Sequence, residues 1–265
     1  MSVNLNGHQN PMSSVQFVTS PLSQNSREHQ IANLINNAQN GQWQIEDGID
    51  WSIHPSPPNF LTQRFIGRAL GALMAGEEAT AAACKMLLAD MPDTDMRICL
   101  EFQAADEDRH AEVYRSYLER VGMPPLIPDG FREATRQLVN WKGPPAGLIF
   151  AVHVVLESEA LTLQHELSDD IRCPLFRAIN RRVTQDEARH VAFGQLISVS
   201  ANAQLTAQER QETVAAIKSI WDACIKALVN DNAVLWRAVK GFSERRWALQ
   251  AKSLEKLGLI DPVPA

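Results

Sequence analysis

The chain has 265 residues, of which 45% are hydrophobic, and its formal net charge is −6 at pH 7. A chain of this length and composition buries one large core, and we expect one large domain rather than two. The acidic balance and the lack of a basic run argue against nucleic acid as the main partner, because such binding relies on clustered Lys and Arg. The four cysteines are widely spaced without a Cys-x-x-Cys pair, so neither a zinc cluster nor a disulfide framework is indicated.

Neither a secretory signal nor a membrane span is predicted, so we expect a soluble, cytoplasmic protein. The amino terminus stays polar, and the longest apolar run, residues 146–156, is too short to cross a bilayer. Residues 1 to about 45 are rich in Asn, Gln and Ser without a sustained hydrophobic period, which is typical of a flexible or loosely packed arm. Residues 43–51 are interpreted as an extended lead-in whose tryptophans cover the rest of the protein. We therefore divide the chain into an arm and lead-in, residues 1–58, and one helical domain, residues 59–265.

Helical hydrophobic periods dominate the rest of the chain, and prolines mark their breaks. The expected bundle helices span about residues 59–90, 93–121, 145–168 and 174–201, with a short helix near 130–141 bridging the second and third. Two more helices, about 205–230 and 232–256, follow the bundle. Asp93 is the expected cap of the second helix and Gly122 its end. No stretch alternates as a strand does, so the predicted fold class is all-α: a four-helix bundle with an N-terminal arm and two additional C-terminal helices.

One pentapeptide pattern, Asp-Glu-x-Arg-His, occurs at residues 106–110 and again eighty positions later at residues 186–190. Each copy contains Glu-x-x-His, and residues three apart share a helix face, so a carboxylate and an imidazole can reach the same metal ion. Another glutamate precedes the glutamate of each copy by 30 residues. Together these residues match the ligand set of a carboxylate-bridged two-metal site inside a four-helix bundle. The candidate metal ligands are Glu77, Glu107, His110, Glu157, Glu187 and His190.

The neighbours of these residues favour a metal centre over the alternative, a pair of salt-bridged surface helix faces. Apolar residues surround Glu77 and Glu157 at helical spacing, so both glutamates belong to faces that pack inward. Four carboxylates buried together repel one another, and two divalent ions would neutralise them. Glu78 and Glu159 are rival ligands, but only Glu77 and Glu157 share the eighty-residue register.

The remaining residues of each copy suit a supporting role. Asp106 and Asp186 are placed to accept the second N–H of a metal-bound imidazole, within a helix or across the bundle. Arg109 and Arg189 would then compensate the charge of these aspartates. The alternative interpretation is that both arginines are solvated.

With these residues, the chain resembles the ferritin-like diiron-carboxylate superfamily, and within it the oxygen-activating branch, over about residues 60–200. The pentapeptide looks like that of the bacterial multicomponent monooxygenase hydroxylases and is similar to the second motif of soluble acyl-carrier-protein desaturases. The resemblance implies a ferritin-like four-helix bundle that holds two Fe ions, or one Mn and one Fe, on the six candidate ligands. Those monooxygenases carry a threonine one turn after the third-helix glutamate, where this chain has Leu161.

The same resemblance marks Asp106, Asp186 and Tyr114 as candidate catalytic residues. Tyr114 lies four residues after His110, where the ribonucleotide reductase small subunit places its radical tyrosine. The alternative for Tyr114 is a core tyrosine that is hydrogen-bonded near the site. His153 precedes Glu157 by one turn, and we interpret it as a core or supporting histidine rather than a ligand.

The predicted function is O2-dependent oxidation of a small, partly apolar organic substrate by hydroxylation, N-oxygenation or desaturation. The implied partners are the substrate, O2 and an electron-donating reductase or ferredoxin, and a homodimer is compatible with the resemblance. The alternatives are iron storage or detoxification of the ferritin or bacterioferritin type, and a radical generator resembling the ribonucleotide reductase small subunit. The predicted substrate pocket is lined by Ala81, Cys84, Leu161, Phe193 and Gly194.

Overall fold

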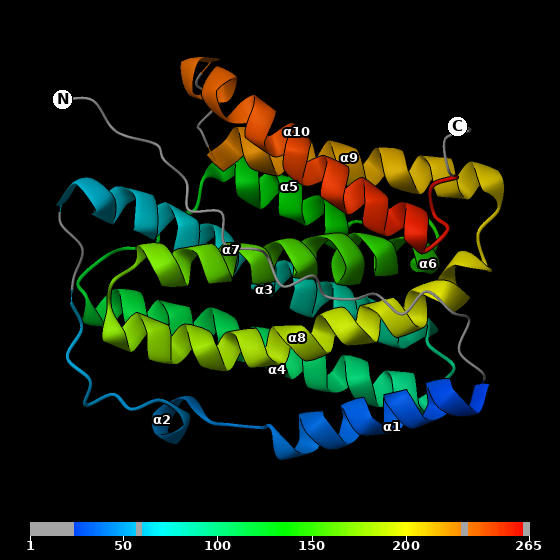
Figure 1. Cartoon of the computed structure of the whole chain (residues 1–265), viewed down its shortest axis with the longest axis horizontal. Coiled ribbons are helices and arrows are strands. Elements are labelled where there is room, and N and C mark those ends of the chain that lie inside the picture. Colours follow the sequence, from blue (N-terminus) through cyan, green and yellow to red (C-terminus); the bar gives the residue numbers. More distant parts are fainter. Residues whose placement is uncertain (1–23, 57–59, 229–232, 262–265) are drawn as a thin grey trace.

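The structure, a computed structural model, describes residues 24–56, 60–228 and 233–261. Within these ranges every regular element is a helix, which confirms the predicted all-α class. Four long helical segments form the ferritin-like bundle (Figure 1), and short connections join the first to the second and the third to the fourth. The segments are α3 (Phe60–Asp90), α4 (Thr94–Arg120), the continuous run α6–η1–α7 (Pro145–Asp170) and α8 (Pro174–Asn202).

Local signals in the sequence set the helix ends. The side chain of Asp93 accepts a hydrogen bond from the backbone N–H of Met96 at 3.0 Å, which caps α4 as predicted. Gly122 follows the end of α4 with a φ of 69°, a conformation that a glycine adopts without steric cost. Pro174 occupies the first turn of α8, where its missing N–H has no helical partner to lose.

The third bundle helix changes its winding immediately before Glu157. It begins as α6 (Pro145–Ile149), continues as the π-helical turn η1 (Phe150–Leu156) and returns to α-helix as α7 (Glu157–Asp170). A π turn widens the helix, and such turns occur frequently at functional sites. This whole segment is long and apolar enough to cross a membrane, but most of it is buried inside the protein. Its apolar composition therefore reflects its central place in the core of the protein.

The other helices cover two opposite faces of the bundle (Figure 1). The helices α5 (Asp129–Val139), α9 (Ala207–Leu228) and α10 (Ala233–Lys256) lie together over the face formed by α3 and α7. On the opposite face, α1 (Gln24–Asn40) and the short α2 (Ile45–Gly48) run beside α4 and α8.

The expected flexible arm contains a regular helix in its described part. Of the α1 residues whose burial is described, 26–40, only Ile31 and Ala38 are buried, so the hydrophobic period of the helix is too weak to be recognised in the sequence. Residues 1–23 of that arm lie outside the described ranges.

Two hydrophobic clusters flank the middle of the bundle. One contains Leu70, Tyr114 and Phe176, and the other contains Phe150 and Phe193. Along each bundle helix, the candidate metal ligands fall between the residues of one cluster and the residues of the other. The two clusters therefore enclose a polar layer in the centre of the fold.

Candidate metal centre

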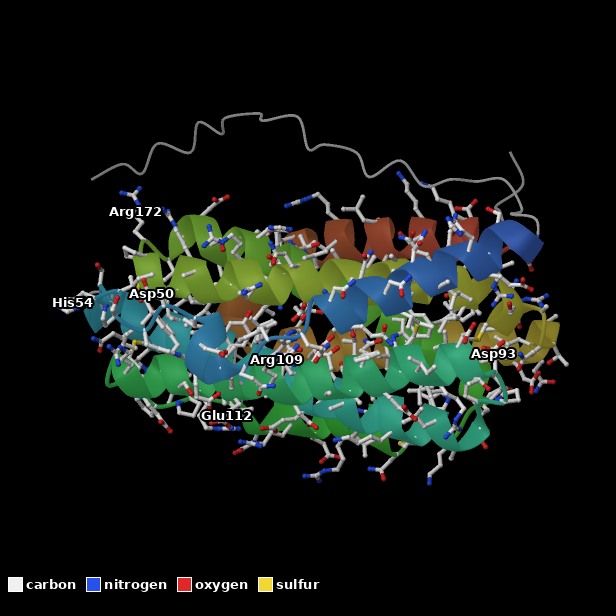
Figure 2. The ribbon with its side chains drawn as sticks, turned by 90° about the horizontal axis from the view of Figure 1, so that it is seen from below. Asp50, His54, Asp93, Arg109, Glu112 and Arg172 are labelled. Atoms are coloured by element: carbon white, nitrogen blue, oxygen red, sulfur yellow. The ribbon has the colours of Figure 1, made fainter. Side chains whose placement is uncertain are left out.

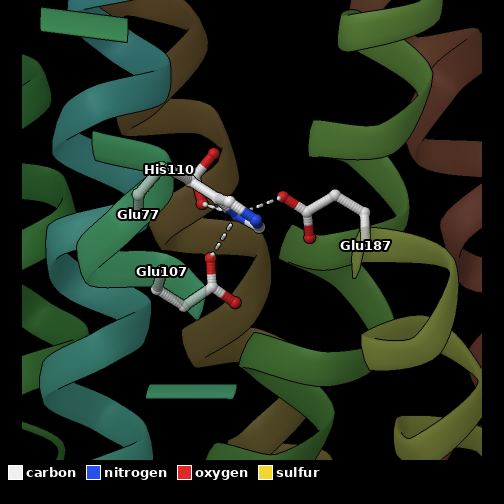
Figure 3. Close-up of side chains that lie close together, drawn as sticks. All are labelled: Glu77, Glu107, His110 and Glu187. Atoms are coloured by element: carbon white, nitrogen blue, oxygen red, sulfur yellow. Dashed lines mark ion pairs between the residues drawn. The ribbon is translucent and has the colours of Figure 1, made fainter. Parts of the chain in front are cut away.

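The bundle brings the six candidate ligands together in that polar layer. Glu77 comes from α3, and Glu107 and His110 come from α4. Glu157 is in the first turn of α7, and Glu187 and His190 are in α8. Each of the six side chains is buried. Figure 3 shows Glu77, Glu107, His110 and Glu187 pointing toward one another. The other two candidate ligands, Glu157 and His190, complete the set of six.

The six side chains form two overlapping groups, each suited to one metal ion. The first group is Glu77, Glu107, His110 and Glu187, and the second is Glu107, Glu157, Glu187 and His190. Within each group, one ligand atom per residue lies within 4.8 Å of the others. Because Glu107 and Glu187 belong to both groups, these two carboxylates would be within reach of both ions of a metal pair.

The Nδ1 atoms of both histidines face the carboxylates. The Nδ1 of His110 lies 3.2 Å from Glu187 Oε1 and 3.5 Å from Glu107 Oε2. The Nδ1 of His190 lies 3.0 Å from Glu107 Oε1 and 3.1 Å from Glu187 Oε2. Both imidazoles therefore direct the same nitrogen into the centre of the site.

The Nε2 atoms bind the aspartates of the opposite copy of the pentapeptide. The Nε2 of His110 lies 3.2 Å from Asp186 Oδ2, and the Nε2 of His190 lies 3.2 Å from Asp106 Oδ2. The sequence left open whether these pairs form within a helix or between helices, and the structure places both between α4 and α8. With a metal bound at Nδ1, both histidines would take the Nε2–H tautomer, because the carboxylate accepts this proton and the Nδ1 lone pair is left for the metal.

The two arginines close a ring of charges around these aspartates. Arg109 contacts Asp106 and lies 3.2 Å from Asp186, while Arg189 lies 3.1 Å from Asp106 and 2.7 Å from Asp186. Each arginine therefore spans α4 and α8, which agrees with the predicted compensation and not with solvated arginines. Burial opposes ionisation of Asp186, but hydrogen bonding to His110 and the nearby charges hold its pKa below the ordinary value.

The segment between α1 and α2 covers this ring. Trp43, which is buried, donates its indole N–H to Asp186 Oδ2 at 2.8 Å, and the Arg109 guanidinium lies 4.7 Å from the centre of its ring. Gln42 donates to Asp106 Oδ1 at 3.3 Å. Figure 2 looks onto this face and labels Arg109, which lies where the chain leaves α1. The prediction that a tryptophan of the lead-in covers the bundle is thus correct for Trp43.

Two buried glutamines, which the sequence did not single out, hold the carboxylates. Gln103 donates to Glu157 Oε1 at 2.7 Å and to Glu107 Oε1 at 3.2 Å. Gln164 donates to Glu187 Oε1 at 3.1 Å. Gln103 precedes Glu107 by four residues and Gln164 follows Glu157 by seven, so helical spacing from a ligand is the signal that identifies them.

The unpaired atoms and the shifted pKa values of the site fit two divalent ions. Glu77 Oε1, Glu107 Oε2 and His110 Nδ1 are buried without a hydrogen-bond partner among the described residues. Burial raises the pKa of Glu77 and Glu157 well above the ordinary value, and nearby carboxylates add to this effect. Hydrogen bonds to carboxylates raise the pKa of both histidines against the opposing effect of burial.

These directions show that the buried carboxylates favour positive charge at their centre, held as protons on the glutamates and histidines. Two divalent cations would supply that positive charge in place of protons. The oxygen and imidazole donors suit iron and manganese. The residues present therefore fit a dinuclear metal cofactor.

Three other candidates lie close to this centre in other roles. The Tyr114 hydroxyl is buried and donates to Asn180 Oδ1 at 2.9 Å, which agrees with a hydrogen-bonded core tyrosine. The rivals Glu78 and Glu159 fall outside both ligand groups, and each pairs with an arginine on its own side of the bundle. His153 is buried in the core, and burial lowers its pKa to about 3.

The substrate pocket predicted from the sequence is misplaced. Cys84 and Phe193 are packed in the core, and the space beside Gly194 is filled by His153, whose Cβ would lie 2.5 Å from an added Cβ. A cavity of about 190 Å³ lies instead between α3, α5, α7, α9 and α10. Glu77 and Glu157 line this cavity, so it reaches the candidate metal centre from the face that α9 and α10 cover.

Comparison with known proteins identifies the family. No curated protein matches the chain. Among solved structures, a mutant of the R2-like ligand-binding oxidase with an anaerobically reconstituted Mn/Fe cofactor is similar, with a TM-score of 0.63, 16% identity, and 85% of this chain and 93% of that chain covered. Another mutant of that oxidase gives a TM-score of 0.62 at 16% identity, with 86% and 94% covered. At this identity the likeness shows the ferritin-like fold.

A match to a family model identifies the family of the chain as well as its fold. The model described as p-aminobenzoate N-oxygenase AurF matches residues 82–258, which is more than half of the chain and includes both copies of the pentapeptide. The four-helix bundle, its buried polar layer and the match to the family model all agree with a ferritin-like metal-binding protein. The chain belongs to the p-aminobenzoate N-oxygenase AurF family and is an O2-dependent oxidoreductase of the ferritin-like diiron superfamily.

Proposed function

We propose that this chain is an oxygenase or oxidase whose six buried side chains hold two Fe ions, or one Mn and one Fe. The observation that supports this most strongly is the pair of overlapping ligand groups that share Glu107 and Glu187. When bound, such ions supply the electrons that activate O2 for attack on an organic molecule. The proposed ligands are Glu77, Glu107, His110, Glu157, Glu187 and His190.

In this proposal, the protein orients the ligand side chains and limits the access of water to the site. Asp186 and Asp106 hold the two imidazoles in one tautomer and one orientation through their Nε2 atoms. The glutamine amides fix one oxygen each of Glu157 and Glu187. The mostly apolar cavity then brings a substrate to the side of Glu77 and Glu157 while it limits the access of water.

N-oxygenation of an amine is the reaction that the family description favours among those open to such a centre. The net reaction takes an amine, O2, two electrons and two protons to a hydroxylamine and water. The two electrons require a donor such as a reductase or a ferredoxin. Hydroxylation and desaturation use the same balance of O2 and electrons and are distinguished by the product. A cytoplasmic location and a homodimer stay predictions.

Tyr114 has a structural place in this proposal. Its hydroxyl is bound to Asn180, and Asn180 in turn donates to the backbone carbonyl of Gln164 at 2.8 Å. This chain of hydrogen bonds holds Gln164 beside Glu187. We therefore propose that Tyr114 supports the carboxylate layer through Asn180 and Gln164.

Metal quantification followed by rapid mixing of the reduced protein with O2 tests the proposal. We expect about two metal ions per chain and an absorbance change on mixing with O2. Glu107→Ala and His190→Ala are expected to lose the metals. Glu78→Ala is the matched control, because Glu78 is the exposed neighbour of Glu77 and pairs with Arg115. Full metal content in both of the first two variants, with folding checked by circular dichroism, would refute the ligand assignment.

A further inference from the structure

The outer end of the cavity carries a cluster of three charged side chains. Arg246 of α10 lies 2.6 Å from Glu159 through Nε and 2.6 Å from Glu166 through Nη1, and all three residues line the cavity. The side chain of Arg246 is only 11% exposed, while that of Glu166 is 48% exposed. The cluster therefore stands between the interior of the cavity and solvent, where it ties α10 to α7.

The single positive charge of this cluster is already paired with carboxylates. Arg246 is the one cation among the described residues that line the cavity, and it already faces two carboxylates. One arginine and two carboxylates give the cluster a net charge of −1, and the cluster offers carboxylate oxygens to a ligand.

The inner end of the cavity reaches buried groups that still need partners. Glu77 lines the cavity, is buried, and has one carboxylate oxygen without a hydrogen bond among the described residues. The walls between the two ends are largely apolar, with Leu73, Ile217 and Trp221 among them. A molecule in this cavity therefore has an apolar body, one end at the proposed metal centre and the other end at the charged cluster.

The size of the cavity limits that molecule to about one ring. A dry engineered cavity of about 150 Å³ lined by apolar side chains holds benzene, and this cavity measures about 190 Å³. The extra room accommodates a few more non-hydrogen atoms. The volume is small beside the pockets of drug-sized ligands, which begin at about 300 Å³.

We infer that the substrate is a small apolar molecule of about one ring, whose outward-facing group is a hydrogen-bond donor such as an amine or amide, and that Glu159 and Glu166 select it over a carboxylate. This inference rests on the proposed function, because it places the substrate beside the proposed metal ligands. An aromatic carboxylate such as p-aminobenzoate, with its amine toward the metals, would bring a third carboxylate to Arg246. The charge of the cluster thus directs this chain toward a different outer substituent.

Binding of two matched probes to the metal-loaded, full-length protein tests the inference. We choose 4-methylbenzylamine and 4-methylbenzoate, which have the same ring and opposite charges, and measure each affinity by calorimetry near neutral pH. The amine is expected to bind at least about fivefold more tightly, because even in bulk water a unit charge at roughly 4 Å changes an affinity by about that factor. Equal or tighter binding of the benzoate, or no binding of either probe, would overturn the inference.

Charge variants make the test specific to the cluster. Glu166→Gln is expected to reduce the amine-to-benzoate preference at least about fivefold, since it removes one carboxylate from the pair that faces Arg246. Glu244→Gln is the matched control on α10, because Glu244 is exposed and pairs with Lys240. An unchanged preference in Glu166→Gln would contradict the assignment. Both probes report binding alone, so failure of the O2 reaction with the amine preference intact would count against the proposed function only.

Discussion

The contact between α8 and η1 at Gly194 leaves no room for a side chain, and Gly194→Ala is expected to destabilise the protein. An added Cβ would lie 2.5 Å from the Cβ of His153 and 2.7 Å from its carbonyl oxygen. The carbonyl belongs to the backbone and cannot rotate away, so the two helices must move apart. Overpacking of this kind costs about 1–3 kcal/mol, and the better helix propensity of alanine offsets up to ~1 kcal/mol of it. A net loss of about 1–2 kcal/mol corresponds to a Tm lower by about 2–8 °C in a protein of this size.

Thermal unfolding of the metal-free protein, followed by circular dichroism, measures this loss. Gly76→Ala is the control, because an added Cβ there has no atom within 4 Å. That change is expected to raise the Tm by about 1–3 °C, since alanine is favoured over glycine in a helix interior by roughly 0.5–1 kcal/mol. His153 and Gly194 are each four residues from a proposed ligand, so Gly194→Ala is also expected to weaken metal binding. A Tm equal to or above that of the wild type would refute the reasoning.

Three further predictions concern the metal centre. Asp106→Ala removes the acceptor of His190 and is expected to weaken metal affinity about 10–100-fold in chelator competition, with the exposed Asp108→Ala unchanged. Because the pKa values of Glu77 and Glu157 are raised, the stability that their neutral forms contribute to the metal-free protein is complete below the ordinary value of 4.5 and is lost as the pH rises through the raised values. Metal uptake must displace these protons, so affinity is expected to rise as the pH rises above 4.5 through the raised values, and a pH-independent affinity would contradict this. Tyr114→Phe is expected to keep the metals and to lose about 1–3 kcal/mol in denaturant unfolding, since it leaves Asn180 Oδ1 buried without its donor; loss of the metals would argue for a direct role in the centre.

The convergence of the six candidate side chains could be predicted from the sequence because their pattern repeats. The two pentapeptides and the glutamates 30 residues before them are on regular helices, so spacing along the chain translates directly into shared faces. The same regularity explains why most helix boundaries were predicted within a few residues. Asp93, Gly122 and Pro174 each act locally, and their effects need no tertiary contact.

Features that depend on tertiary contacts could not be predicted in the same way. The cavity is formed by α9 and α10 packing over α3 and α7, so residues such as Arg246 and Glu159 meet from distant parts of the sequence. The π-helical turn before Glu157 has no distinct sequence period. Gly194 was expected to leave room for a substrate, yet the backbone at His153 occupies that room. Helical periodicity predicts which face of a helix carries a residue, but it does not predict which neighbour packs against that face.

The crossed pairing of Asp106 with His190 and of Asp186 with His110 has a consequence for the order of folding. Neither helical hairpin, α3 with α4 or α7 with α8, carries the acceptor that orients its own histidine. An isolated hairpin therefore lacks the aspartate that orients its histidine. The imidazoles acquire their final orientation only once the α3–α4 and α7–α8 hairpins dock. Docking of the two halves and orientation of the two histidines are in this way one event.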